Sequence, residues 1–199
     1  MDSQLPKSEV QLDCVDHKKN MTPLQKHVAF FDSNKDGIVY PWETYKGFRA
    51  VGFGVMKSLA AGVLINVALS YSTLPGRMPS LLFPIYINNI HKAKHGSDTD
   101  VYDKEGNFDS HKFEAIFSKY ACTQKDRLTR SELDSMLKSN REPKNVPGWI
   151  ASKVEWDFLY DLAKDDKGFL EKEAIRGVYD GTLFELYEKK NCDKSILKK

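Results

Sequence analysis

The sequence predicts a mainly α-helical protein that contains an EF-hand, a helix–loop–helix unit that binds calcium. Residues 32–43 carry oxygen-bearing side chains at the spacing of an EF-hand loop. Apolar residues recur at helical spacing around this loop and through the C-terminal half. A proline cluster between uncharged stretches interrupts that pattern. We therefore divide the chain into a flexible N-terminus (1–21), a calcium-binding EF-hand (22–51), an apolar segment (52–90), a helical C-terminal region (91–189) and a flexible tail (190–199).

Composition limits the class of protein. The chain has 199 residues, of which 41% are hydrophobic and 29% charged, as in ordinary folded proteins. The net charge is +2, which argues against nucleic acid as the main partner, because such binding requires a strongly basic surface. Cys14, Cys122 and Cys192 are widely spaced and odd in number, so we expect free thiols in a protein that faces the cytosol. Residues 1–21 are polar and lack the apolar core of a signal peptide.

Two helices are expected to flank the calcium loop. The first should begin at Thr22, a favourable N-cap residue, with Pro23 in the first helical position. The second should begin at Pro41 and continue past Phe48. The apolar face of the first helix comprises Leu24, His27, Val28 and Phe31.

The loop has a donor at every strong calcium-ligating position. Calcium takes roughly six to eight oxygen ligands. The ligands here would be the side chains of Asp32, Asn34 and Asp36, the carbonyl of Ile38 and both carboxylate oxygens of Glu43. Gly37 allows the sharp turn that the loop needs at its sixth position. Tyr40 occupies the ninth position, so a water would have to reach the ion directly there.

The apolar segment 52–90 has no charged residue between Lys57 and Arg77, and none again between Arg77 and its end. A helix that spans a bilayer needs about 20 apolar residues. This stretch is shorter, includes Asn66 and runs into a cluster of helix-breaking prolines. These are Pro75, Pro79 and Pro84. Two interpretations fit the pattern: a hairpin that enters an apolar phase and turns back, or a buried core helix of a soluble protein.

The C-terminal region contains several amphipathic helical patterns. Thr129 and Glu132 have the spacing of a capping box at a helix start. The apolar stripes, which we expect to form core, are Phe113, Ile116, Phe117 and Tyr120; Leu133, Met136 and Leu137; Ile150, Val154, Phe158 and Leu162; and Ala174, Ile175, Val178 and Tyr179.

Two later segments, 121–132 and 163–174, have the outline of the calcium loop without its ligands. In both, alanine occupies the first position, where calcium binding requires an acid. We therefore expect a second, degenerate EF-like helical pair that folds without metal. Residues 101–112 lack an acid at their last position, and we interpret them as a polar surface turn.

These features occur together in one known family. The calcium loop, the uncharged segment and the proline cluster are followed by Asn88-Asn-Ile-His-Lys-Ala-Lys-His-Gly-Ser-Asp98. From about Leu24 to Lys189 the chain resembles the caleosins, plant and fungal lipid-droplet proteins also called peroxygenases, and its short N-terminal extension resembles that of the shorter members. The spacing of Pro75, Pro79 and Pro84 resembles the family's proline knot, which implies a lipid-inserting hairpin.

The resemblance implies an oxidoreductase with two cofactors, Ca²⁺ and haem b. Family members transfer oxygen from a fatty-acid hydroperoxide to an unsaturated fatty acid, which becomes an epoxide. The family's haem histidines correspond to His27 and His95, the implied catalytic and cofactor-binding residues, and His91 is a rival for His95. Two firm ligands would leave peroxide no open position on iron, so one histidine must be weak or act as a distal acid–base. We favour His27 as the proximal ligand, and filling the calcium loop should fix its helix.

The resemblance also implies location and partners. We expect the protein on lipid droplets and the endoplasmic reticulum membrane, at their cytosolic face. Fatty-acid hydroperoxides and unsaturated fatty acids would be its substrates, self-association is allowed, and nucleic acid is not expected. The alternative is a non-catalytic, calcium-binding structural or docking protein of lipid droplets. A soluble calcium sensor is disfavoured, because sensors expose Met-rich grooves and the 5 Met of this chain are scattered.

Overall fold

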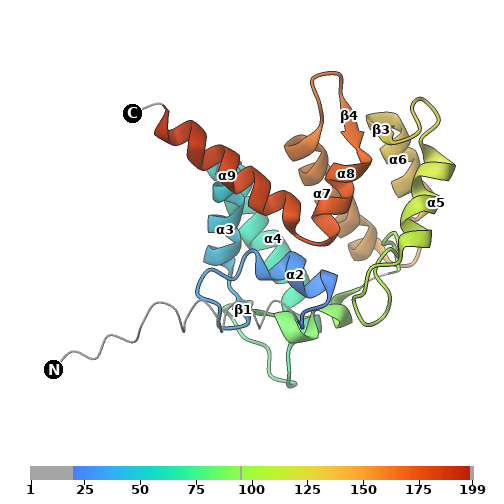
Figure 1. Cartoon of the computed structure of the whole chain (residues 1–199). Coiled ribbons are helices and arrows are strands. Elements are labelled where there is room, and N and C mark those ends of the chain that lie inside the picture. Colours follow the sequence, from blue (N-terminus) through green and yellow to red (C-terminus); the bar gives the residue numbers. More distant parts are fainter. Residues whose placement is uncertain (1–19, 95, 198–199) are drawn as a thin grey trace.

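The computed structural model describes residues 20–94 and 96–197, and this part of the chain is mainly helical, as predicted (Figure 1). Cys14, His17 and His95 lie outside the described residues, as does nearly all of the segment 1–21 that we expected to be flexible.

The N-terminal half contains α2 (Pro23–Ala29), β1 (Ile38–Val39), α3 (Pro41–Ala50), α4 (Val55–Thr73), β2 (Ile85–Tyr86) and the 3₁₀ helix η1 (Ile87–Ala93). The helix α2 begins as predicted, because the Thr22 hydroxyl accepts from the backbone N–H of Gln25 and the Gln25 side chain accepts from that of Thr22. The strand β1 pairs antiparallel with β2, with Val39 opposite Ile85. The calcium-loop strand is therefore bonded to the strand that follows the proline cluster.

The C-terminal half contains α5 (Ser110–Tyr120), β3 (Arg127–Thr129), α6 (Arg130–Ser139), α7 (Val146–Ala163), β4 (Phe169–Glu171), α8 (Lys172–Tyr179) and α9 (Thr182–Ile196). The strands β3 and β4 pair antiparallel, with Leu128 opposite Leu170. Segments 121–132 and 163–174 thus form one helix–loop–helix pair. The N-terminal half repeats this arrangement, with α4, β2 and η1 in the place of the second unit, a repeat that we did not recognise in the sequence.

The helix α9 returns from the C-terminal half to the N-terminal half and crosses α3 (Figure 1). The Asn191 side chain donates a hydrogen bond of 3.1 Å to the carbonyl of Ala50. Near the start of α9, the Phe184 ring contacts those of Phe30 and Phe31. The helix extends to Ile196, so the boundary that we expected at residue 190 falls inside it.

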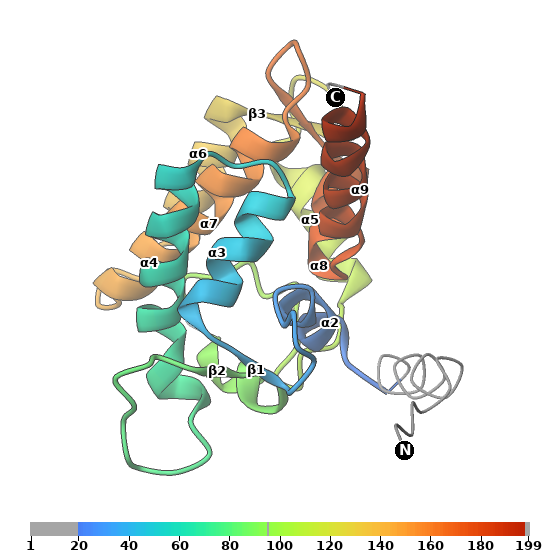
Figure 2. The ribbon, with the colours of Figure 1, turned by 90° about the vertical axis from the view of Figure 1, so that its left-hand side faces the viewer.

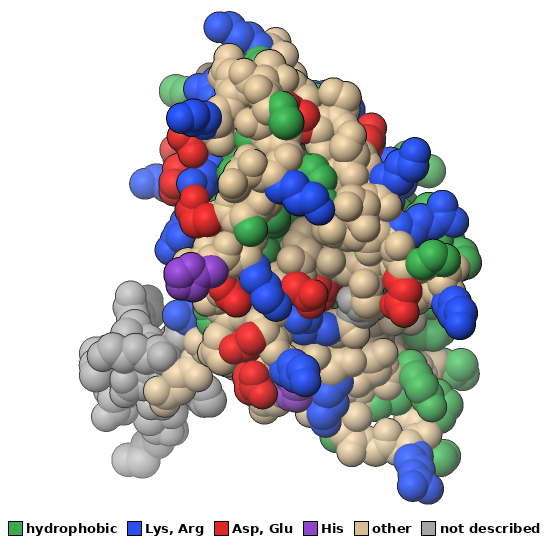
Figure 3. Space-filling model, turned by 90° about the vertical axis from the view of Figure 1, so that its right-hand side faces the viewer, with side chains coloured by type: hydrophobic (Ala, Val, Ile, Leu, Met, Phe, Trp, Pro, Cys, Tyr) green, Lys and Arg blue, Asp and Glu red, His purple; other side chains and the backbone are tan. Residues whose placement is uncertain are grey.

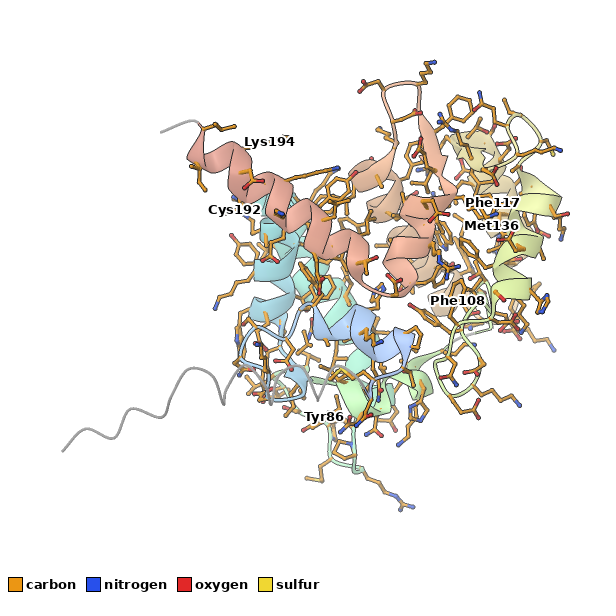
Figure 4. All side chains as sticks on the ribbon, viewed as in Figure 1. Tyr86, Phe108, Phe117, Met136, Cys192 and Lys194 are labelled. Atoms are coloured by element: carbon orange, nitrogen blue, oxygen red, sulfur yellow. The ribbon has the colours of Figure 1, made fainter. Side chains whose placement is uncertain are left out.

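The core of the C-terminal half contains most of the expected apolar stripes, and Phe117 of α5 and Met136 of α6 lie within it (Figure 4). The expected stripe on α7 is wrong in part, because Ile150 is 47% exposed and the face of Trp156 and Leu159 is the buried one. Phe158 contacts the core of the N-terminal half, and Leu162 contacts both cores. The helix lies between two cores, so one apolar stripe could not describe it.

The buried face of α4 consists of small and polar residues, and most of its large apolar residues lie outside, although Ile65 and Leu69 are partly buried against the core. Gly62 allows α3 and α4 to lie close together, because a Cβ there would lie 2.6 Å from the Pro41 carbonyl oxygen. Figure 2 shows the two helices side by side, with the 74–84 loop extending beyond them. The inner face comprises Ser58, Ala61, Gly62, Asn66, Ser70 and Thr73. The outer face includes Leu59, Val63, Leu64, Val67 and Tyr71, each about half exposed or more.

The hydrogen bonds of Asn66 explain why this apolar helix contains a polar residue. Its side chain is fully buried and donates 2.9 Å hydrogen bonds to the carbonyls of Val39 in β1 and Phe83, the residue before Pro84. Its carbonyl oxygen accepts from the Thr44 hydroxyl of α3 at 2.6 Å. Asn66 therefore joins four parts of the N-terminal half.

The structure bears on both interpretations of the apolar segment 52–90. The helix α4 packs on α3 along one side, yet among the described residues it is the one helix long and apolar enough to cross a membrane. The 74–84 loop adds Met78 and Leu81, which are 85% and 92% exposed. Apolar side chains gather along the right-hand edge of the face in Figure 3, where α4 and this loop lie. This surface is compatible with lipid or membrane association.

Replacing Asn66 with Leu should lower the free energy of unfolding by about 3 kcal/mol, because buried polar groups that lose their partners cost roughly 1–3 kcal/mol each. Urea unfolding followed by circular dichroism measures the change. The matched control is Ser72→Leu, which places the same side chain on the exposed face of the same helix. Equal stability of the two variants would contradict the role assigned to Asn66.

Candidate functional site

A cavity of about 250 Å³ lies where the two halves meet. Its walls come from α2, α3, α4, η1, α7, α8, α9 and the segment 94–102. Most lining side chains are apolar, and Phe31, Phe48 and Phe158 are among them. Polar groups interrupt this lining at a few positions, which include His27 and Glu155. An apolar cavity with few polar groups is the usual form of a small-molecule site.

His27, in the last turn of α2, borders this cavity and is fixed by the C-terminal half. Its Nδ1 atom lies 2.7 Å from the carbonyl oxygen of Val178 at the end of α8. A carbonyl can only accept, so Nδ1 carries the proton and Nε2 has a free lone pair. The Phe184 ring packs against the imidazole edge-on, with 5.0 Å between ring centroids.

Burial lowers the pKa of His27, and the hydrogen bond to the Val178 carbonyl and the charge of Asp180 oppose this only in part. The imidazole is therefore neutral at neutral pH. Histidines that ligate metals commonly donate their other ring N–H to a backbone carbonyl, which fixes the tautomer and the ring orientation. His27 thus has the protonation state and the hydrogen bond of a metal ligand.

The other histidines differ in position. His91, at the end of η1, is not among the described residues that line the cavity, and His111 is exposed on α5. The placement of His95 is outside the described residues, although Lys94 before it and Asp98 after it both line the cavity.

Hydrogen-bonded polar residues lie on the cavity wall formed by segment 94–102 and α8. The hydroxyls of Thr99 and Tyr179 are 2.7 Å apart, and the Tyr102 hydroxyl donates to the carbonyl of Tyr179 at 2.6 Å. Burial raises the pKa of both tyrosines, which are therefore neutral. Sequence reasoning missed this group, because its members come from segments far apart in the chain.

Glu155 of α7 is a second lining residue that sequence reasoning missed. Burial raises the pKa of its carboxyl to about 7, and the negative charge of Asp98 adds to the rise. The one available signal was an acid in an otherwise apolar stretch, between Val154 and Trp156.

The backbone of the predicted calcium loop has the required turns. Lys35 and Gly37 have φ angles of 60° and 83°, and the glycine adopts its value without steric cost. The Asp32 carboxylate accepts from the backbone N–H groups of Asp36 at 3.3 Å and Gly37 at 2.8 Å. Burial raises the pKa of Asp32, and the Gly37 hydrogen bond opposes the rise. Asp32 thus holds the loop closed from its first position.

Glu43, the last loop residue, is 2% exposed and accepts from the backbone N–H groups of Ser33 and Tyr40. Glu132 makes the same kind of contacts in segment 121–132, with Cys122 and Thr129. A glutamate at this position therefore closes the loop whether or not other ligands exist. Within residues 20–94 and 96–197, no group of three or more His, Cys, Asp or Glu is placed to hold a metal ion.

A comparison with protein families identifies the chain. The model described as "Caleosin related protein" matches residues 19–188. The chain belongs to the caleosin family. This confirms the resemblance found in the sequence.

This caleosin is similar to proteins named as peroxygenases. It is 56% identical to "Peroxygenase" of Lilium longiflorum, over 88% of this chain and 74% of that protein. It is 54% identical to "Probable peroxygenase 4" of Arabidopsis thaliana, over 88% of this chain and 90% of that protein. These names agree with the prediction of an oxidoreductase. A third relative, "Probable inactive peroxygenase-like protein" of Arabidopsis thaliana, is 44% identical over 75% of this chain and 72% of its own length. No solved structure matches the chain.

Proposed function

We propose that this caleosin is a calcium-dependent haem peroxygenase that transfers oxygen from a fatty-acid hydroperoxide to an unsaturated fatty acid. The observation that carries the proposal is His27, a neutral imidazole on the wall of an apolar cavity, with Nδ1 bonded to Val178 and Nε2 available to a metal. The names of the two most similar reported relatives support this function.

The residues that line the cavity suit a haem, whereas the volume of the cavity is small for one. Apolar side chains such as Phe48 and Leu69 would contact the macrocycle, and His27 Nε2 would ligate the iron. When bound, haem would supply the redox chemistry that splits the O–O bond. The volume of about 250 Å³ lies below the roughly 300–1,000 Å³ of common small-molecule pockets. Haem binding would therefore require the two halves to separate further.

The remaining histidines would have different roles. His95 lies outside the described residues, and Lys94 and Asp98, on either side of it in the chain, line the cavity. It would serve as the distal or displaceable group, as the resemblance implies. His91 is the weaker candidate, because it lies outside the lining.

We also propose that the loop 32–43 binds one calcium ion, in the first of three EF-like units. Asp32, Asn34, Asp36, Ile38 and Glu43 would supply the oxygens, which suit a hard cation. These side chains do not yet converge on one point, so calcium would draw them together. The loop begins directly after α2, so its occupancy would bias the position of the helix that carries His27.

The outer face of α4 and the 74–84 loop would rest on lipid, at the cytosolic face of a droplet or the endoplasmic reticulum. Their large apolar side chains are exposed, whereas the inner face of α4 is held by α3. The bonds that connect β1 with β2 argue for an attached surface of this kind rather than a freely inserting proline-knot hairpin. Pro75 and Pro79 are exposed and Pro84 is buried, so they shape the loop.

A non-catalytic droplet protein remains the second candidate function. One observation favours it: a relative with 44% identity is named as probably inactive. Such a protein would use the same calcium loop and apolar surface for docking and for self-association. The experiment on haem below separates the two functions.

His27→Val should abolish oxygen transfer and greatly reduce haem absorbance, because it removes the proposed iron ligand. Removal of calcium from the wild-type protein should lower both the rate of oxygen transfer and the haem absorbance. Absorbance spectra and epoxide formation, recorded during a calcium titration, measure these effects. The matched control is His111→Val, an exposed histidine. If spectrum and rate are indifferent to both His27 and calcium, the non-catalytic function is favoured.

Glu43→Gln should weaken calcium binding by more than the roughly 10–100-fold that outer-shell changes cost, because it removes a charged ligand while keeping the side-chain size. Isothermal calorimetry measures the affinity. Glu132→Gln is the matched control, because Glu132 occupies the same loop position without an acid at the first. Unchanged affinity in Glu43→Gln would show that calcium binds elsewhere.

Replacing Leu81 and Leu82 together with Ser should reduce binding to phospholipid-coated oil droplets by roughly tenfold or more, because each buried Leu contributes about 1.5–3 kcal/mol. Flotation with droplets measures the bound fraction. The control replaces Ile196 and Leu197, which are also exposed, on α9. Equal losses in both variants would show that the 74–84 loop is not the lipid contact.

A further inference from the structure

Glu155 lines the cavity, and the proposed function gives it no role. It projects from α7, whose other lining residues are Ser152, Trp156, Phe158, Leu159 and Leu162. Its side chain is exposed where it borders the cavity, although protein surrounds it closely enough to raise the pKa of its carboxyl. His27 lines the same cavity.

Among the described residues, no hydrogen bond or salt bridge engages the Glu155 carboxyl. A carboxyl that borders a cavity without a protein partner is free to bond a molecule that enters the cavity.

Acids and tyrosines surround Glu155. Asp98, from the segment before α5, interacts with it unfavourably through their like charges. Tyr102 and Tyr179 lie within electrostatic range, and both are neutral. His27, from α2, is neutral as well. These neighbours favour the protonated form of the Glu155 carboxyl.

The basic residue on the described cavity wall does not reverse this tendency. Lys94 lies 3.7 Å from a carboxylate oxygen of Asp98 and 3.7 Å from one of Asp100, and it also donates to the carbonyl of Tyr102. Its charge is therefore shared with the acids of its own segment. A substrate carboxylate would find no unshared cation there, so the reactive part of a fatty acid, rather than its head group, is the part expected beside Glu155.

We propose that Glu155 is a catalytic proton-transfer residue, which accepts the proton of the hydroperoxide and returns it to the departing alcohol oxygen. This inference rests on the proposed function. The pKa of about 7 supports it, because such a carboxyl is efficient both as a base and as an acid at neutral pH.

The proton and electron balance is complete without a further reactant. The Glu155 carboxylate takes the O–H proton of the hydroperoxide as the O–O bond breaks. The outer oxygen adds to the double bond of the unsaturated fatty acid and forms an epoxide. The inner oxygen takes the proton back from Glu155 and leaves as an alcohol. The hydroperoxide is reduced by the same electron pair that the alkene gives up, and Glu155 returns to its ionised form.

The test compares Glu155→Gln with Asp161→Asn, which removes the same charge from an exposed position on the same helix. Glu155→Gln should slow oxygen transfer by roughly 10²–10⁴-fold while haem absorbance is kept. In the unchanged protein, kcat/KM should rise with pH through about 7, as the accepting carboxylate forms. Glu155→Gln should lose that rise, and Glu155→Asp should recover part of the rate. An unchanged rate, or an unchanged pH profile, would overturn the proposal.

Infrared difference spectra of the haem-free protein provide a readout that does not depend on activity. A protonated-carboxyl band should disappear as the pH is raised through neutrality, and Glu155→Gln should lack it. Absence of that band in the unchanged protein would overturn the proposal even if the variant failed to fold. Failure of the proposed function is a separate outcome: the unchanged protein would then transfer no oxygen, and both ideas would be rejected together.

Discussion

The buried amide of Asn66 is the contact on which the N-terminal half depends. It bonds β1 and the end of the proline loop with its N–H groups and α3 with its oxygen. These bonds satisfy backbone carbonyls that would otherwise be buried without partners beside an apolar helix. One side chain thus ties the small, polar face of α4 to its neighbours, while most of the large apolar residues of the helix face outward.

The elements with local signals could be predicted from the sequence, and the long-range ones could not. The start of α2 at Thr22 and the capping box of Thr129 depend on residues within a single turn. The β1–β2 pairing and the two-sided burial of α7 depend on segments far apart in the chain. The sequence therefore did not indicate that the apolar segment supplies α4, β2 and η1, the second unit of the N-terminal half.

The residues of the candidate site also fall into two groups: those that local sequence spacing indicates and those that only the fold brings together. The oxygen donors of the predicted calcium loop follow each other along the chain, so the prediction needs their spacing alone. His27 was named only through the family resemblance, since its distinguishing partner, the carbonyl of Val178, lies on α8. Glu155 carries only one local signal, an acid within an apolar stretch, because its surroundings are formed by a cavity between the two halves. Sequence spacing finds ligands that share a loop, whereas groups gathered by packing require the fold.

The position of α2 links these separate parts. At its start, Leu24 N–H donates to the carbonyl of Gly106, and near its end His27 is bonded to Val178, so the C-terminal half holds the helix at both points. Phe31, just before the calcium loop, packs so closely on Gly47 of α3 that a Cβ there would lie 2.4 Å from its ring. A change in the loop therefore cannot be absorbed locally between α2 and α3, and it would be transmitted to the imidazole that faces the cavity.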